Sequence, residues 1–329
     1  MLRAGGPLDL VFADENGPKP DDPWLPAEPK TDPPKQYHIP PTTPVTGKAD
    51  VYVEASKKWV SVNRYLNGWC AIAWIVRTDP DKGGSPLVPK TPGPKRLLSY
   101  PTQAMVDKVS EAMKKANDIL SQCRIALRFC EVIVLDARRL YYFKNGDKNQ
   151  KTPLSDGFTK NVDLVGGPTP DFTDILDQIV NSGFAEDEMD GGNKVLGTDL
   201  YDRFLSKLRK PCVHFFFVNA IQDAKNPNDK NSGLTNHQKL GGKLGGNVVE
   251  TPISLIDSKL DPETIAHEAG HALGLHHSED DADPAVKGDQ SNLMKAKGDG
   301  KSLQPTQCAA MKAYLDKTIA PACPGDVTK

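Results

Sequence analysis

Four histidines and a glutamate lie close together in the last quarter of the chain. Residues 261–278 read DPETIAHEAGHALGLHHS and contain four of the seven histidines of the whole sequence. His267 and His271 are four residues apart, which places two side chains one turn apart on the same face of an α-helix. Their imidazoles can therefore reach one metal ion, and the segment predicts a metal site.

The residues around these histidines predict where a helix begins and ends. Asp261 is a good N-cap and Pro262 suits the first helical position, so we expect a helix to begin here and to run through the motif. Gly274 can turn the chain sharply after the helix. The chain would then return and offer His277 as the third ligand. His276 is the competing candidate, but the spacing from Gly274 favours His277.

This ligand set predicts hydrolytic chemistry. Three neutral imidazoles on Zn²⁺ leave a fourth position for water, as in catalytic rather than structural zinc sites. Zinc lowers the pKa of that water toward ~7. Glu268 can hydrogen-bond the zinc-bound water, take its proton as it attacks a carbonyl, and pass the proton to the leaving amine. We therefore expect one catalytic zinc ion, with Glu268 as the catalytic residue.

The complete segment HEAGHALGLHH resembles the extended zinc-binding motif of the metzincin metallopeptidases, HExxHxxGxxH. Metzincins also have a tight turn with a methionine beneath the metal, and the segment SNLM, which ends at Met294, is similar to it. The resemblance implies an α+β zincin fold with a twisted mixed sheet, a backing helix, a zinc-binding active-site helix and a smaller C-terminal subdomain. It also implies a metalloendopeptidase that acts on a protein or peptide substrate.

The resemblance further implies a place for the substrate. In the family, an edge strand before the zinc helix pairs with an extended substrate. That strand would lie here in residues 246–251, with the candidate substrate-binding residues Gly246, Asn247, Val248 and Val249. The chain also departs from the family, because Ala296 stands where several metzincins carry a tyrosine, two residues after Met294. No cysteine-switch motif is present, so the subfamily stays open.

The patterns elsewhere predict the order of elements. Dense or alternating apolar residues predict strands, and apolar residues at helical spacing predict a long helix and a C-terminal helix. The predicted strands are 51–55, 70–77, 124–136, 213–221 and 247–256, and the helices are 102–121, 262–274 and 305–318. Pro252, inside the last of these strands, indicates an edge or a bend.

Composition divides the chain into a tail and one large domain. Residues 1–47 contain eleven of the 28 prolines, so we expect a poorly ordered tail or linker. Residues 48–329 are expected to form the metzincin-like catalytic domain. An insertion is expected around 144–210, a loop at first and then two short helices near 172–179 and 200–208. Residues 226–246, rich in Gly, Asn and Lys, are expected to form a long loop.

Six cysteines without a CxxC pair favour disulfides over a cysteine metal site, with six reduced thiols as the alternative. Cys308 and Cys323 are our first candidate pair, because they flank a short helical pattern. The N-terminus does not resemble a secretory signal. Three explanations are open. The signal belongs to a part of the protein that is not in this sequence, export uses another route, or the protein stays inside the cell. On balance we expect a secreted or periplasmic protein.

Charge and hydropathy limit the partners. The formal net charge is −2 and no apolar run approaches ~20 residues, so we expect no nucleic-acid partner, no membrane insertion and a monomer. The oxygen-rich segments 190–193 and 229–233 could bind Ca²⁺, although plain turns explain them more simply. His38 and His237 lie in polar segments and are expected to be solvated, and His214 is expected in the core or at an edge.

Two other functions stay open. The Pro-rich tail and a compact, disulfide-capable protease domain would also suit a protease toxin or effector domain of a bacterial secretion system. A catalytically silent binding module that keeps zinc for structure is the second alternative. Glu268 argues against the second alternative, because a structural site has no use for a base there.

Overall fold

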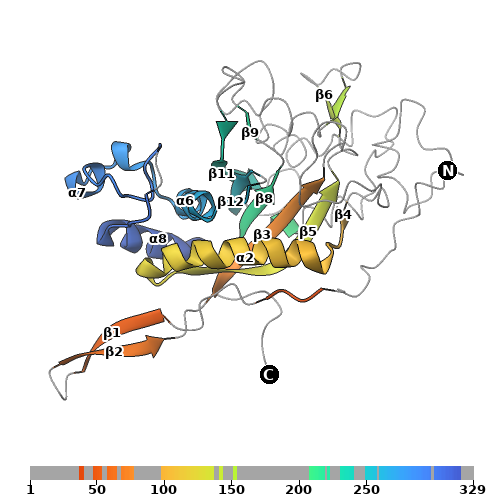
Figure 1. The fold of residues 1–329 in the computed structure, drawn as a ribbon. Helices are drawn as coiled ribbons and strands as arrows, with labels where there is room; N and C mark the ends of the chain where they lie inside the picture. Colours follow the sequence, from red (N-terminus) through yellow and green to blue (C-terminus); the bar gives the residue numbers. More distant parts are fainter. Residues whose placement is uncertain are drawn as a thin grey trace, which may run out of the picture.

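The computed structural model describes residues 37–40, 47–53, 58–64, 68–77, 98–136, 141–143, 151–153, 207–218, 221–222, 230–240, 249–257, 259–297 and 300–319. Its main element is a mixed sheet of six strands (Figure 1). In chain order these are β3 (Gly68–Arg77), β4 (Leu98–Ser99), β5 (Ala126–Asp136), β8 (Val213–Phe217), β11 (Gly233–Leu240) and β12 (Val249–Ile256).

The sheet is mostly parallel, with an antiparallel strand at each edge. Its spatial order is β11-β12-β8-β3-β5-β4. The four inner strands run parallel to one another, whereas β11 and β4 run antiparallel to their neighbours. The inner strands β3 and β8 are buried from Cys70 to Val76 and from Val213 to Phe217, and apart from His214 these runs are apolar. Such runs are typical of parallel strands that are covered on both faces.

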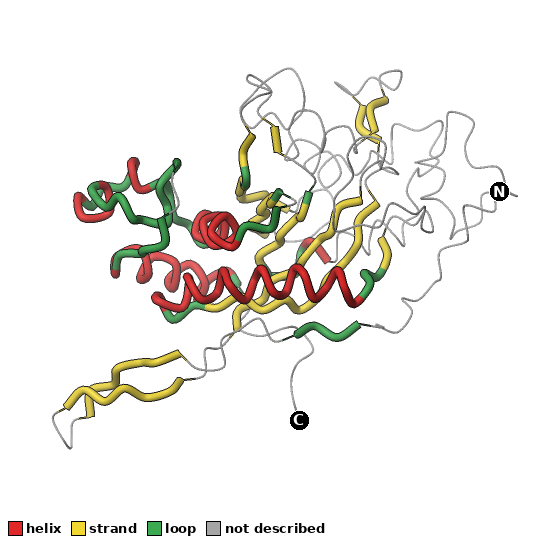
Figure 2. Tube along the Cα trace, viewed as in Figure 1, coloured by secondary structure: helices red, strands yellow, loops and turns green. Residues whose placement is uncertain are grey.

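The longest helices in the described part of the chain are drawn in red in Figure 2. They are α2 (Gln103–Leu120), α6 (Pro262–Ala272) and α8 (Pro305–Thr318). The predicted apolar stripe of α2, from Met105 to Leu120, is buried. Because α2 packs against β5 and α6, and α6 packs against β11 and β12, both helices lie on the same face of the sheet. The predicted helices 102–121, 262–274 and 305–318 are confirmed to within three residues at their ends.

Side chains close the outer edge of β5 where β4 does not reach. The amide of Asn117, on α2, donates to the carbonyl of Leu127 at 2.7 Å and accepts from its N–H at 2.8 Å. The hydroxyl of Tyr37 donates to the carbonyl of Val132 at 2.8 Å and accepts from its N–H at 3.3 Å. Both side chains therefore replace the hydrogen bonds of a missing strand. Tyr37 belongs to the predicted tail, and its described residues, 37–40, are thus attached to the sheet.

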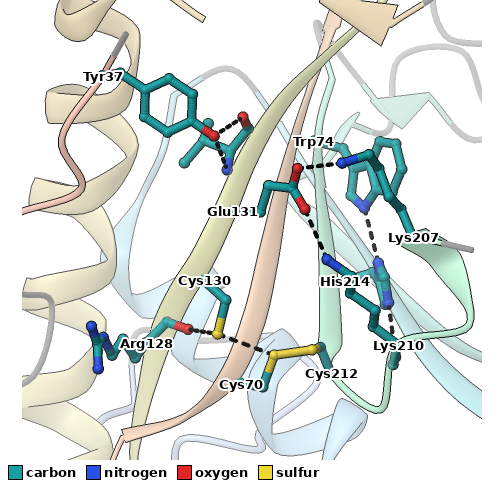
Figure 3. A network of polar contacts seen from close by, with 11 residues as sticks. Tyr37, Cys70, Trp74, Arg128, Cys130, Glu131, Lys207, Lys210, Cys212 and His214 are labelled. Carbon is teal, nitrogen blue, oxygen red and sulfur yellow. Dashed lines mark hydrogen bonds and ion pairs between the residues drawn. A yellow bond between two sulfur atoms is a disulfide. The ribbon is translucent and has the colours of Figure 1, made fainter. Parts of the chain in front are cut away.

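A buried charge cluster lies on the sheet (Figure 3). Glu131 of β5 is 3 % exposed and pairs with Lys207 and, at 3.0 Å, with Lys210. His214 of β8 is fully buried, as predicted for a core residue, and its Nδ1 accepts a hydrogen bond from Trp74 at 2.9 Å. Burial lowers the pKa of His214 to about 4, so this imidazole is neutral at pH 7.

Two disulfides between described residues join distant parts of the chain. One links Cys70 of β3 to Cys212, next to β8, and the other links Cys123 to Cys308 at the beginning of α8. Our candidate pair Cys308–Cys323 is therefore wrong. The pairing follows from contacts between distant segments. The short helix η2 (Ser121–Cys123) follows α2 and lies beside the chain that leads into α8. There the side chain of Gln122 makes hydrogen bonds with the backbone of Lys301 and Leu303. No cysteine in the described part of the chain is free.

Three small hairpins in the described part of the chain lie outside the main sheet. They are β1 (Gly47–Val53) with β2 (Lys58–Arg64), β6 (Tyr141–Phe143) with β7 (Lys151–Pro153), and β9 (Ile221–Gln222) with β10 (Lys230–Asn231). The first hairpin projects away from the sheet in Figure 1. β7 lies in a segment that we predicted as a loop. It forms a strand there because it pairs with β6. None of the helices described is long and apolar enough to cross a membrane.

The edge strand β11 is the main departure from the sequence predictions. Its residues lie inside the predicted loop 226–246, yet all eight pair with β12. Their Gly, Asn and Lys content is unfavourable for a strand, so pairing with β12 overrides local propensity. The predicted strand around Pro252 is confirmed, from Val249 onward. Pro252 pairs only with β11, and pairing with β8 begins at Ile253, so the missing N–H is tolerated there.

Candidate metal centre

The helix that carries the histidines begins as predicted. Asp261 caps it, because its side chain accepts a hydrogen bond from the backbone N–H of Thr264 at 2.9 Å, and Pro262 is the first helical residue. The two faces of this helix differ in burial. Ile265, Ala266 and Ala269 are fully buried, whereas His267 and His271 are only partly buried and share the face that leads to the site. Packing of the apolar face against β11, β12 and α2 therefore holds the two histidines.

The turn after α6 also follows the prediction. Gly274 has φ +88°, a left-handed conformation that glycine adopts without strain. The N–H of Leu275 then returns to the carbonyl of Gly270 at 3.0 Å, which closes the helix end. The chain reverses and brings His277 back to the first two histidines, while the neighbouring His276 is exposed.

The three predicted ligands come together. One nitrogen from each of His267, His271 and His277 lies within 4.8 Å of the others. The ring centroids are 4.7 Å apart for His267 and His271, 5.5 Å for His267 and His277, and 4.7 Å for His271 and His277. In the part of the chain that the structure describes, this is the one group of such residues that can hold a metal ion.

Backbone carbonyls determine the tautomers of two ligands. The Nδ1 of His267 lies 2.7 Å from the carbonyl of Leu293, and the Nδ1 of His271 lies 2.8 Å from that of Leu275. A carbonyl only accepts, so each Nδ1 carries the proton and donates it. In a neutral imidazole the Nε2 then carries a lone pair. A hydrogen bond from the second ring nitrogen is how proteins usually orient a metal-binding histidine.

The two Nε2 atoms face each other across only 3.0 Å. Two lone pairs at this distance repel each other unless a cation lies between them. A shared proton would require one imidazole to be charged. Burial, and for His271 also the neighbouring His267, lowers the pKa of both groups, to about 4 for His271, so both are neutral at pH 7. A metal ion is therefore the cation that fits this arrangement.

Met294 packs against α6 at Gly270. It is fully buried, and its sulfur fills the space beside Gly270, between His267 and His271 on α6, where a Cβ would overlap it. Its N–H donates to the side chain of Asn292 at 2.9 Å, and its carbonyl accepts from the N–H of Ser278 at 2.8 Å. The turn thus supports His277 through its neighbour Ser278, and it supports His267 through the carbonyl of Leu293.

Glu268 is buried next to the first ligand. Its side chain is 5 % exposed, and burial raises its pKa to about 8, opposed by a hydrogen bond from Thr235. The hydroxyl of Thr235 donates to Oε2 at 2.6 Å. A nearby metal cation would favour the ionised carboxylate. Glu268 is thus a buried carboxyl group whose protonation would respond to the charge in the site.

The sequence interpretation missed the contribution of β11. Gly233, Thr235 and His237 alternate along it, and all three contact α6. His237, which we expected to be solvated, is half-buried and donates from Nε2 to the carbonyl of His271 at 3.0 Å, so that prediction is wrong. His38 is exposed, as expected. The alternation of these residues was the available signal, hidden by the loop-like composition.

The candidate substrate-binding residues are only partly described. Val249 is the first residue of β12, an inner strand, and the strand at the sheet edge is β11. Gly246, Asn247 and Val248 lie outside the described residues, as do the calcium candidates 190–193 and Asp229. The first predicted helix of the insertion also lies outside them, and only residues 207 and 208 of the second are described, as helix.

The chain matches no protein-family model and no curated protein. We therefore infer the chemistry of the site from its own residues alone.

Proposed function

We propose that this protein is a zinc-dependent endopeptidase of the metzincin kind, which hydrolyses peptide bonds in a protein or peptide substrate. One observation carries the proposal. Two histidine Nε2 atoms face each other at 3.0 Å with a third histidine beside them, next to a buried glutamate. A structural metal site has no need for this glutamate, whereas a hydrolytic site requires a base there.

The residues have separate roles in this proposal. His267, His271 and His277 would hold the zinc ion, which supplies Lewis acidity and lowers the pKa of a water molecule. Glu268 would accept the proton of the attacking water and deliver it to the amine that leaves. Leu293 and Leu275, through their carbonyls, keep His267 and His271 in the tautomer that presents Nε2.

The order of elements supports the resemblance to metzincins. That family has a strand, a long helix, further strands, the zinc helix, a methionine turn and a C-terminal helix. The chain follows this order with β3, α2, β5, β8, β11, β12, α6, the turn at Met294 and α8. The buried contact between Met294 and Gly270 is the arrangement expected of a methionine that lies beneath the metal.

The sheet edge supports a place for the substrate. β11 pairs with β12 on one side, and among the described strands it has no neighbour on the other. An extended peptide can add to such an edge through backbone hydrogen bonds. We therefore assign substrate pairing to β11, whose inner face already contacts Glu268 and α6.

The disulfides bear on the compartment. Cys70–Cys212 and Cys123–Cys308 are features of proteins that fold in an oxidising environment. This supports a secreted or periplasmic enzyme, and it is equally compatible with an exported toxin or effector domain.

Cleavage of a peptide library by the full chain tests the proposal. The wild type should cleave, lose activity with a chelator and recover it with Zn²⁺. Glu268→Ala should retain zinc and lose about 10²–10⁴-fold in kcat. Glu111→Ala, which removes an exposed glutamate of α2, is the matched control and should stay active. A wild type that binds zinc yet cleaves no member of the library would rule out the enzyme and favour a silent binding module.

A further inference from the structure

The inner face of β11 contacts the glutamate that we propose as the base. Thr235 donates from its hydroxyl to Oε2 of Glu268 at 2.6 Å. The same hydroxyl oxygen lies 2.8 Å from the hydroxyl of Ser254, on the neighbouring strand β12. Ser254 is fully buried. Three polar groups from two strands and one helix therefore form a short chain that ends on the carboxylate.

The direction of the hydrogen bonds in this chain follows from their chemistry. With Glu268 ionised, as the proposed base must be, its carboxylate only accepts, so the single hydroxyl proton of Thr235 goes to Glu268. The backbone carbonyl of Glu268 lies 3.1 Å from the same hydroxyl. Ser254 must then donate to the oxygen of Thr235. Ser254 thus orients Thr235, and Thr235 orients the carboxylate. Hydrogen bonds to a charged group are stronger than neutral ones, so the contact at the carboxylate is the stronger of the two.

Gly233 restricts the same carboxylate by shape. A Cβ at this position would overlap the Cγ of Glu268, and it would lie 2.5 Å from Oε1 and 2.7 Å from Cδ. The side chain of Glu268 therefore packs directly against the backbone of β11. Oε2 is held by Thr235, while Oε1 has no hydrogen-bond partner among the described residues.

We infer that Thr235 is a positioning residue, which holds one oxygen of Glu268 so that the other is presented for proton transfer. The inference rests on the proposed function for its catalytic meaning. A general base must lie within hydrogen-bond reach of the proton that it removes, and small misplacements are costly. A rigid strand that fixes the carboxylate before substrate binds removes the need to order this side chain during the reaction.

Kinetics of Thr235→Val test the inference. Valine keeps the shape and removes the hydroxyl. We expect kcat to fall about 10- to 100-fold while KM and zinc content stay the same. Thr235→Ser, which restores the hydroxyl, should return kcat to near the wild-type value. If the contact were merely structural, Thr235→Ser would not restore kcat, and Thr235→Val would not lower kcat while leaving KM unchanged.

Thr251→Val is the matched control. Thr251 is a buried threonine in β12, 1 % exposed, and its hydroxyl has no hydrogen-bond partner. The same substitution there removes a hydroxyl that holds nothing, so kcat should not change. Equal kcat for Thr235→Val and Thr251→Val would overturn the inference.

A double-mutant cycle in thermal unfolding keeps the inference testable without activity. Thr235→Val should lower the midpoint in the wild-type background and have little effect in a Glu268→Ala background, because the two groups interact. Additive shifts would show that the hydroxyl does not hold the carboxylate. If no form cleaves any peptide, the proposed function fails, and the cycle still decides whether this contact exists.

Discussion

The geometry of the candidate metal site depends on atoms that no histidine pattern specifies. HEAGHALGLHH predicts three ligands and a base, and the structure brings one nitrogen of each of the three histidines within 4.8 Å of the others and packs Met294 against Gly270 of the same helix. The backbone carbonyls of Leu293 and Leu275, which select the tautomers, could not be predicted, because they depend on how two turns fold back. Thr235 was also missed, since its strand has the composition of a loop.

The contact between Gly270 and Met294 leads to the first prediction. Gly270→Ala would place a Cβ on the sulfur of Met294, which is fully buried and has little room to move. Such overpacking costs about 1–3 kcal/mol, so the unfolding midpoint should fall and zinc should dissociate faster. In a Met294→Ala background the space is free, and the same alanine should cost much less. Equal losses in both backgrounds would contradict the contact.

Glu131 leads to a pH prediction. Burial raises its pKa, but hydrogen bonds and charge from Lys207 and Lys210 outweigh burial and leave the pKa below the ordinary value of 4.5. A carboxyl with a lowered folded pKa stabilises the fold above its unfolded pKa and loses this contribution as the pH falls through the folded value. Unfolding midpoints measured from pH 7 to pH 3 should thus fall more steeply for the wild type than for Glu131→Gln below about pH 4.5. Parallel curves would mean that the ion pairs contribute nothing.

At the scale of elements, the helices and strands that are buried were the ones that the sequence predicted. The inner strands and the stripe of α2 were predictable, because their side chains are apolar at the spacing of the element. β11 was not, because its conformation comes from pairing with β12 rather than from its own residues. The strand β11, which bonds the carboxylate of Glu268, was therefore the element that local patterns could not identify.

The closed edge of β5 gives a prediction at this scale. Asn117→Leu removes the two hydrogen bonds that its amide makes with the backbone of Leu127. At about 1 kcal/mol each, the free energy of unfolding should fall by roughly 2 kcal/mol in urea titration. Asp118→Ala, at an exposed position of the same helix, is the control and should change it by less than about 0.5 kcal/mol. A loss no larger than that of the control would show that the amide does not replace a strand.

At the scale of the whole molecule, the disulfides were the least predictable feature. Pairing depends on which elements meet in space, and Cys123 and Cys308 are 185 residues apart in sequence. Closeness in sequence, which led us to pair Cys308 with Cys323, did not predict the bond. This bond joins η2, at the end of α2, to α8. Gln307 of α8 accepts a hydrogen bond from Asn292, so the bond also fastens the turn that carries Met294 to the end of α2.

Removing the Cys123–Cys308 bond should therefore weaken both the fold and the site. The chain-entropy model gives about 5 kcal/mol as the stabilisation from a loop of this length. The double variant Cys123→Ser, Cys308→Ser should unfold at a lower temperature and release zinc faster to a chelator. Lower stability with unchanged zinc release would indicate that the bond supports the fold alone.

The central claim is that three converging imidazoles hold one metal ion beside Glu268. Anomalous diffraction at the zinc edge, from crystals of the zinc-loaded protein, tests it most directly. We predict a single strong peak about 2.0–2.1 Å from one nitrogen of each of His267, His271 and His277, with Glu268 close but not bound. A peak elsewhere, or a zinc ion that binds Glu268 or His276 in place of His277, would contradict the account.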